Sequence, residues 1–125
     1  MGRLPAEELG ALYTGATGVV APSLFEGFGM TVLEAMQCGC PVACSSLTAL
    51  PEVAGEAALL FDPRNPDAFG EALVRISNDE TLRERLREAG FGQAAKFDWQ
   101  QTARGTIDAL GEAVRGRAER GGEER

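Results

Sequence analysis

Two glutamates at the ends of a glycine-bearing segment are the residues of this sequence best placed to do chemistry. Glu26 and Glu34 bracket the stretch GFGMTVL. A carboxylate can accept two hydrogen bonds from a vicinal diol, such as the 2′- and 3′-hydroxyls of a ribose. Glu34 suits that contact, and Glu26 suits hydrogen bonds from the hydroxyls of a sugar. The residues between them would then hold the phosphates that link the two groups.

The segment between the carboxylates has the composition of an anion-binding turn. Gly27 and Gly29 allow the backbone to approach a ligand closely. The N–H groups of Gly29, Met30 and Thr31 are expected to open a helix, where free donors and the helix dipole favour a diphosphate. Thr31 adds a hydroxyl donor. One site would thus offer contacts to ribose, diphosphate and sugar in that order.

A simpler interpretation of the same glutamates stays open at this point. Charged residues usually face water, so Glu34 could be a solvated helix residue and Glu26 an exposed loop residue. The position of the pair at a strand-to-helix junction favours a site. The residues alone leave an anion site and ordinary turn chemistry equally open.

The elements expected around this segment alternate between strands and helices. We expect strands over 19–21, 41–44 and 57–61, and helices over 5–16, 30–38, 51–54, 66–76, 79–89, 93–97 and 100–117. This order predicts an α/β fold, with a parallel sheet that is covered by helices on both faces. Three strands are few for a doubly wound sheet. One edge of the sheet therefore needs cover from another chain or from further residues of the same domain.

Composition excludes several classes of protein. The length of 125 residues suits one small domain, and the charged and apolar fractions are not those of a disordered chain. A net charge of -7 argues against a nucleic-acid partner, which requires a basic face. With no histidine, the chain lacks the commonest general base and metal ligand.

The three cysteines do not have the spacing of a metal site. Cys38, Cys40 and Cys44 lack the second pair of ligands that zinc needs, so no metal is expected. We interpret them as free thiols, which indicates a reducing cytoplasm. The N-terminus does not have the pattern of a signal peptide, and no apolar run approaches the roughly 20 residues that span a bilayer.

Residues 22–42, PSLFEGFGMTVLEAMQCGCPV, resemble the E-x7-E signature of the retaining group 1 glycosyltransferases of family 4. The likeness continues through residues 50–53 and 57–63 and, with less specificity, into the last helix. It implies a partial Rossmann-like sheet of about three parallel strands, the latter half of the C-terminal domain of a GT-B enzyme. We assign residues 1–117 to this domain and expect residues 118–125 to form a charged, flexible tail.

The resemblance also implies roles for individual residues. Glu34 would bind the nucleotide ribose, and Glu26 would act as the catalytic residue that contacts the transferred sugar. The donor would be a UDP- or GDP-sugar, bound without a metal or other cofactor, and transfer would retain the anomeric configuration. The implied donor-binding residues between the two glutamates are Gly27, Phe28, Gly29, Met30 and Thr31.

Family enzymes carry an N-terminal domain that binds the acceptor, and an Arg and a Lys that hold the diphosphate. No residue here matches those positions, so we expect these 125 residues alone not to transfer sugar at a useful rate. The acceptor would be a glycan, a lipid or a small molecule, met in the cytoplasm or at the inner membrane face.

Two other functions stay open. One is a non-catalytic nucleotide-sugar-binding module that needs a partner chain for its missing N-terminal portion. The other is a structural remnant without a ligand. Self-association through the exposed sheet edge is compatible with any of these functions.

Overall fold

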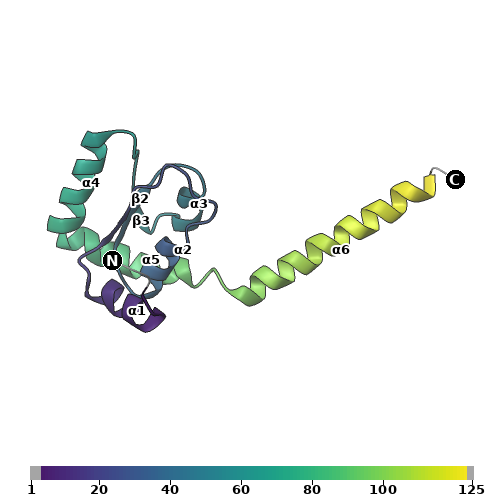
Figure 1. The fold of residues 1–125 in the computed structure, drawn as a ribbon, viewed down its shortest axis with the longest axis horizontal. Helices are drawn as coiled ribbons and strands as arrows, with labels where there is room; N and C mark the ends of the chain where they lie inside the picture. Colours follow the sequence, from purple (N-terminus) through teal and green to yellow (C-terminus); the bar gives the residue numbers. More distant parts are fainter. Residues whose placement is uncertain (1–3, 124–125) are drawn as a thin grey trace. The chain divides into compact units, whose positions relative to one another are not determined.

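The computed structural model describes the backbone of residues 4–123 and the side chains of residues 4–117. The chain divides into two units, Met1–Ala95 and Lys96–Arg125. The division falls inside the range 1–117 that the sequence assigns to one domain. In chain order the elements are α1 (Ala6–Gly15), β1 (Val19–Ala21), α2 (Met30–Gln37), β2 (Val42–Ser45), α3 (Leu50–Ala54), β3 (Ala58–Phe61), α4 (Pro66–Asn78), α5 (Glu80–Ala94) and α6 (Trp99–Glu123) (Figure 1).

The first unit is built on a parallel sheet with the strand order β1-β2-β3. Val20 pairs with Ala43, and Ala43 pairs with Leu59. Because the three strands run in the same direction, their carboxyl ends meet at one edge of the sheet. The loops that follow the three strands therefore gather at that edge, where ligands bind in open α/β sheets.

Helices cover both faces of this sheet. Successive strand residues point to opposite faces, so Ala43 and its neighbour Val42 face different layers. Ala43 belongs to a core cluster with residues of α4 and α5, whereas Val42 and Cys44 are fully buried on the other face, where β2 contacts α2 and α3. The cluster on the α4 and α5 face consists of Ala43, Phe61, Ala72, Ile76, Leu82 and Leu86, with Val20, Leu59 and Phe69 packed against it. The predicted α/β class is confirmed.

The helix end predicted at residue 89 is wrong. Helix α5 continues through Gly90 and Gly92 to Ala94. Gly90 is buried against α2, and a Cβ at this position would lie 3.3 Å from Cγ of Met36. A glycine inside a helix costs about 1 kcal/mol relative to alanine. Here the absence of a side chain allows α5 and α2 to pack closely.

The second unit contains α6, which extends to Glu123 instead of ending at Arg117. Helical hydrogen bonds are local, and residues 118–120 are good helix formers, whereas the glycines at 121 and 122 disfavour a helix. Of the tail expected over residues 118–125, the last two residues lie outside the described part of the chain. No helix in the described part of the chain combines the length and the apolar character needed to cross a bilayer.

Asn65 caps the start of α4. Its side-chain oxygen accepts hydrogen bonds from the backbone N–H groups of Asp67 and Ala68, at 3.0 and 3.3 Å. We predict that Asn65→Ala lowers the free energy of unfolding by about 1 kcal/mol, because these two N–H groups lose their acceptor. Urea denaturation measures the change. Asn65→Asp keeps the acceptor and should stay close to the parent chain, and an equal loss in both variants would contradict the capping role.

Candidate functional site

The turn from β1 into α2 depends on Gly29. This residue precedes the helix with φ 107° and ψ 44°, in the left-handed region that L side chains rarely adopt. A Cβ on Gly29 would lie 2.5 Å from Cδ2 of Leu50, the first residue of α3. Glycine is therefore required here for its conformation and for the space it leaves to Leu50. Gly27 has no such neighbour, because nothing lies within 4 Å of a Cβ added there.

The first two residues of α2 are exposed, and their backbone N–H groups are candidate hydrogen-bond donors. The helix begins at Met30, as the sequence predicts, and Gly29 supplies no side-chain cap. Met30 and Thr31 are exposed, while Gly29 itself is buried. The Val32 N–H donates to the Gly29 carbonyl at 3.0 Å, whereas helix geometry leaves the N–H groups of Met30 and Thr31 without an acceptor inside the helix. This end of α2 can therefore donate hydrogen bonds to an anion, and the helix dipole adds to that preference.

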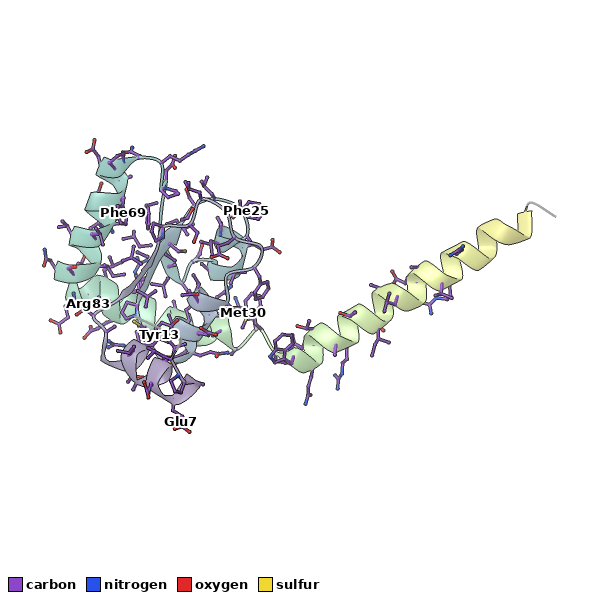
Figure 2. The ribbon with its side chains drawn as sticks, viewed as in Figure 1. Glu7, Tyr13, Phe25, Met30, Phe69 and Arg83 are labelled. Atoms are coloured by element: carbon purple, nitrogen blue, oxygen red, sulfur yellow. The ribbon has the colours of Figure 1, made fainter. Side chains whose placement is uncertain are left out.

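Glu34 is held by a residue of α1. It lies on α2, half-buried, and its Oε2 accepts a hydrogen bond from the Tyr13 hydroxyl at 3.4 Å. Figure 2 labels Tyr13 on α1, the helix that packs against α2. Burial, followed by the negative charge of Glu34, raises the pKa of Tyr13, so the phenol remains a donor. A carboxylate has acceptor capacity beyond one bond, so Glu34 can still bind a hydroxyl-bearing ligand.

Glu26 is held at two points in the loop after β1. The Ser23 hydroxyl donates to its Oε1 at 3.2 Å, and its backbone N–H donates to Oγ1 of Thr48 at 3.0 Å. Glu26 is half-buried, and neighbouring Phe25 projects from the same loop with a highly exposed ring (Figure 2). Glu26 is thus a loop residue that is partly shielded from solvent, and its proposed role stays a prediction.

Thr48 has the unusual backbone of this region. Its φ is 55°, and it is the sole non-glycine residue with positive φ in the described part of the chain. For a β-branched residue this conformation is an outlier that costs on the order of 1–3 kcal/mol. Such strain persists where the surrounding structure holds the residue in place.

The loop after β2 contacts the loop after β1 at two positions. Thr48 contacts the backbone of Glu26, and Leu50 fills the space beside Gly29. The supporting loop is itself ordered by Ser45, a fully buried residue whose hydroxyl accepts from the Leu47 N–H at 3.1 Å. The parallel sheet thus brings two separate segments together at its carboxyl edge.

The sequence pattern missed Tyr13, Ser23 and Thr48 as site residues. Leu9, Leu12 and Tyr13 have the spacing of an apolar stripe on the helix expected over residues 5–16, but α1 has no buried residue and Leu12 is 51% exposed. The phenolic hydroxyl of Tyr13 could have indicated a contact with a polar residue of another element, because a tyrosine that packs there usually finds a hydrogen-bond partner. Thr48 gave no local signal, since its contact is with a residue 22 positions earlier.

The cysteines lie in and beside the core. Cys40 and Cys44 are buried, Cys38 is half-buried, and all three are free thiols. Burial raises the pKa of Cys44 to about 12 and also raises the pKa of Cys40. No group of three or more metal-binding side chains lies together among the residues that the structure describes.

Comparison with known proteins gives consistent results. Residues 1–93 match the protein family described as "Glycosyl transferases group 1". The O-antigen chain mannosyltransferase B of Escherichia coli is 43% identical over 109 residues, which cover 87% of this chain and 29% of that protein. The D-inositol 3-phosphate glycosyltransferase of Frankia alni is 37% identical over 112 residues, covering 88% of this chain and 28% of that protein. The present chain thus spans less than a third of these two relatives.

A solved structure is also similar. Sucrose-phosphate synthase from Thermosynechococcus elongatus, a GT-B glycosyltransferase, superposes with a TM-score of 0.79 and 28% sequence identity. The match covers 93% of this chain and 30% of that one. It confirms the expected fold class.

The two glycines of the turn give a matched pair of variants. We predict that Gly29→Ala lowers the free energy of unfolding by about 2–4 kcal/mol, because the new Cβ enters a left-handed position and contacts Leu50. Gly27→Ala adds a Cβ in open space and should change stability by less than about 0.5 kcal/mol. Urea denaturation of both variants checks this. Equal losses would show that Leu50 does not constrain the turn.

The cysteines should differ in reactivity. The thiolate is the form that iodoacetamide alkylates, and the Cys44 thiol is buried with a pKa of about 12. We predict that Cys38 is alkylated first in the native chain, and that raising the pH from 7 to 9 leaves Cys44 unmodified. Peptide mass spectrometry identifies the modified residue, and all three cysteines should react after unfolding in urea. Native Cys44 that reacts as fast as Cys38 would contradict its burial.

Proposed function

This chain belongs to the group 1 glycosyltransferase family, and on that premise we propose that it is the donor-binding part of an enzyme that uses a nucleotide-activated sugar. The observation that carries the proposal is the start of α2. An exposed helix N-terminus without a side-chain cap lies between two half-buried glutamates, each held by hydrogen bonds. The chemistry of these groups suits a diphosphate flanked by two hydroxyl-bearing sugars.

We assign the ribose to Glu34 and the transferred sugar to Glu26. The Tyr13 bond orients the Glu34 carboxylate on α2, and a vicinal diol can donate to its remaining acceptor positions. Glu26 lies before the helix start, and Ser23 and Thr48 orient it. The amides between the two glutamates, in the segment from Gly27 to Thr31, face the diphosphate.

The donor is a UDP- or GDP-sugar, bound by this part of the enzyme without a metal ion. Backbone donors at the start of α2 supply the contacts that stabilise the diphosphate as it departs. Transfer proceeds with retention, by attack of the acceptor on the face that the leaving group vacates. Several similar proteins of Escherichia coli are named mannosyltransferases, which makes mannose the first sugar to test.

Activity of the whole enzyme needs groups beyond those of this chain. The chain spans 29% of the Escherichia coli mannosyltransferase. We propose that an acceptor-binding domain and further phosphate ligands complete the site, and that the acceptor is a glycan, a lipid or a small molecule. The three free thiols favour a reducing compartment such as the cytoplasm.

Titration of UDP and GDP tests the proposal. We expect saturable binding of one nucleotide to the ¹⁵N-labelled chain, followed by NMR. Glu34→Gln should weaken that binding roughly tenfold or more, because the ribose hydroxyls lose a charged acceptor. The variant keeps the size of the side chain, so a change in packing does not explain the loss.

Glu88→Gln is the matched control. Glu88 is an exposed glutamate of α5, and its substitution removes the same charge without touching the start of α2. Nucleotide affinity should stay within about twofold of the parent chain, because a surface charge change away from the site has little effect. Absence of saturable binding by the parent chain, or equal weakening in both variants, would contradict the proposed function.

A further inference from the structure

We propose that Thr48 is a positioning residue for the donor sugar, because its hydroxyl fixes the backbone from which the Glu26 carboxylate extends. The inference rests on the proposed function and adds to it a residue from a different segment of the chain. Thr48 follows β2, whereas Glu26 follows β1. Their hydrogen bond joins the two loops at the carboxyl edge of the sheet.

The backbone of Thr48 is the first argument. A φ of 55° suits glycine, and a β-branched side chain is disfavoured there. Glycine would adopt this conformation without strain but would bring no hydroxyl. The chain thus has a strained threonine at position 48, although glycine would be unstrained there, and the threonine supplies the hydroxyl that binds the Glu26 N–H. Backbone strain of this kind tends to occur at functional sites.

The two contacts of Glu26 are the second argument. Thr48 holds its backbone N–H at 3.0 Å, and Ser23 holds its Oε1 at 3.2 Å. One bond fixes the main chain and the other fixes the carboxylate, so the position of the side chain is determined at both ends. The carboxylate retains acceptor capacity for the hydroxyls of a ligand.

The third argument is that the loop after β2 has other anchors. The Ser46 N–H donates to the Phe61 carbonyl at 2.8 Å, and the Leu47 N–H donates to the Ser45 hydroxyl at 3.1 Å. Leu50 is buried beside Gly29. These contacts do not involve the Thr48 hydroxyl, so removing it should leave the loop folded and release Glu26.

The test compares Thr48→Gly with Thr48→Ser. Glycine relieves the strain and removes the hydroxyl, whereas serine keeps the hydroxyl. Two quantities are measured by NMR on the ¹⁵N-labelled chain. The first is the hydrogen exchange rate of the Glu26 backbone amide. The second is the ratio of the affinity for a nucleotide-sugar to the affinity for the nucleotide alone. The second comes from titrations of GDP-mannose against GDP and of UDP-glucose against UDP.

We expect Thr48→Gly to speed exchange of the Glu26 amide roughly fivefold or more, the effect of losing one hydrogen bond. The affinity gained from the sugar should fall by a similar factor, while affinity for the nucleotide alone stays within about twofold. Thr48→Ser should match the parent chain in both measurements. The melting temperature of Thr48→Gly should not fall, which separates positioning from a general loss of structure.

Ser46→Ala is the control for a change in the same exposed loop, and it should alter neither quantity. An unchanged exchange rate of the Glu26 amide in Thr48→Gly would overturn the inference. Faster exchange of that amide with an unchanged ratio of nucleotide-sugar to nucleotide affinity would also overturn it. A parent chain that binds no nucleotide would contradict the proposed function instead. The exchange rates would then decide by themselves whether Thr48 holds Glu26.

Discussion

The left-handed turn at Gly29, packed against Leu50, is the constraint on which the arrangement of this site depends. It redirects the chain from the edge of the sheet into α2, and it sets where that helix begins. The first-turn N–H groups, and Glu34 one turn later, are placed by that start. A side chain at this position would displace either α2, which contains Glu34, or Leu50, which lies two residues after Thr48.

The two glutamates are then held by different parts of the fold. Glu34 depends on the packing of α1 against α2, through Tyr13. Glu26 depends on the pairing of β1 with β2, which brings Thr48 beside its backbone. Each glutamate therefore has a hydrogen-bond partner from a second element, Glu34 at its carboxylate and Glu26 at its backbone N–H, and these bonds limit the movement of both residues.

The net charge of the chain bears on the proposed diphosphate site. With a net charge of -7, the protein as a whole repels a diphosphate at long range. Salt screens that repulsion beyond about 8 Å, and the oriented N–H groups at the start of α2 act within that distance. The proposed diphosphate site therefore relies on these backbone groups, and the family match over residues 1–93 is the premise of that proposal.

The amino-acid order by itself determined the three strands, the helix start at Met30 and the segment between the two glutamates, because turns, caps and periodicity are local properties. It failed at Gly90, where packing against Met36 outweighs the tendency of glycine to end a helix. Only the tertiary structure decided that Tyr13 binds Glu34 and that Thr48 binds Glu26. These contacts span 21 and 22 residues and exist only once helix docking and strand register bring distant elements together.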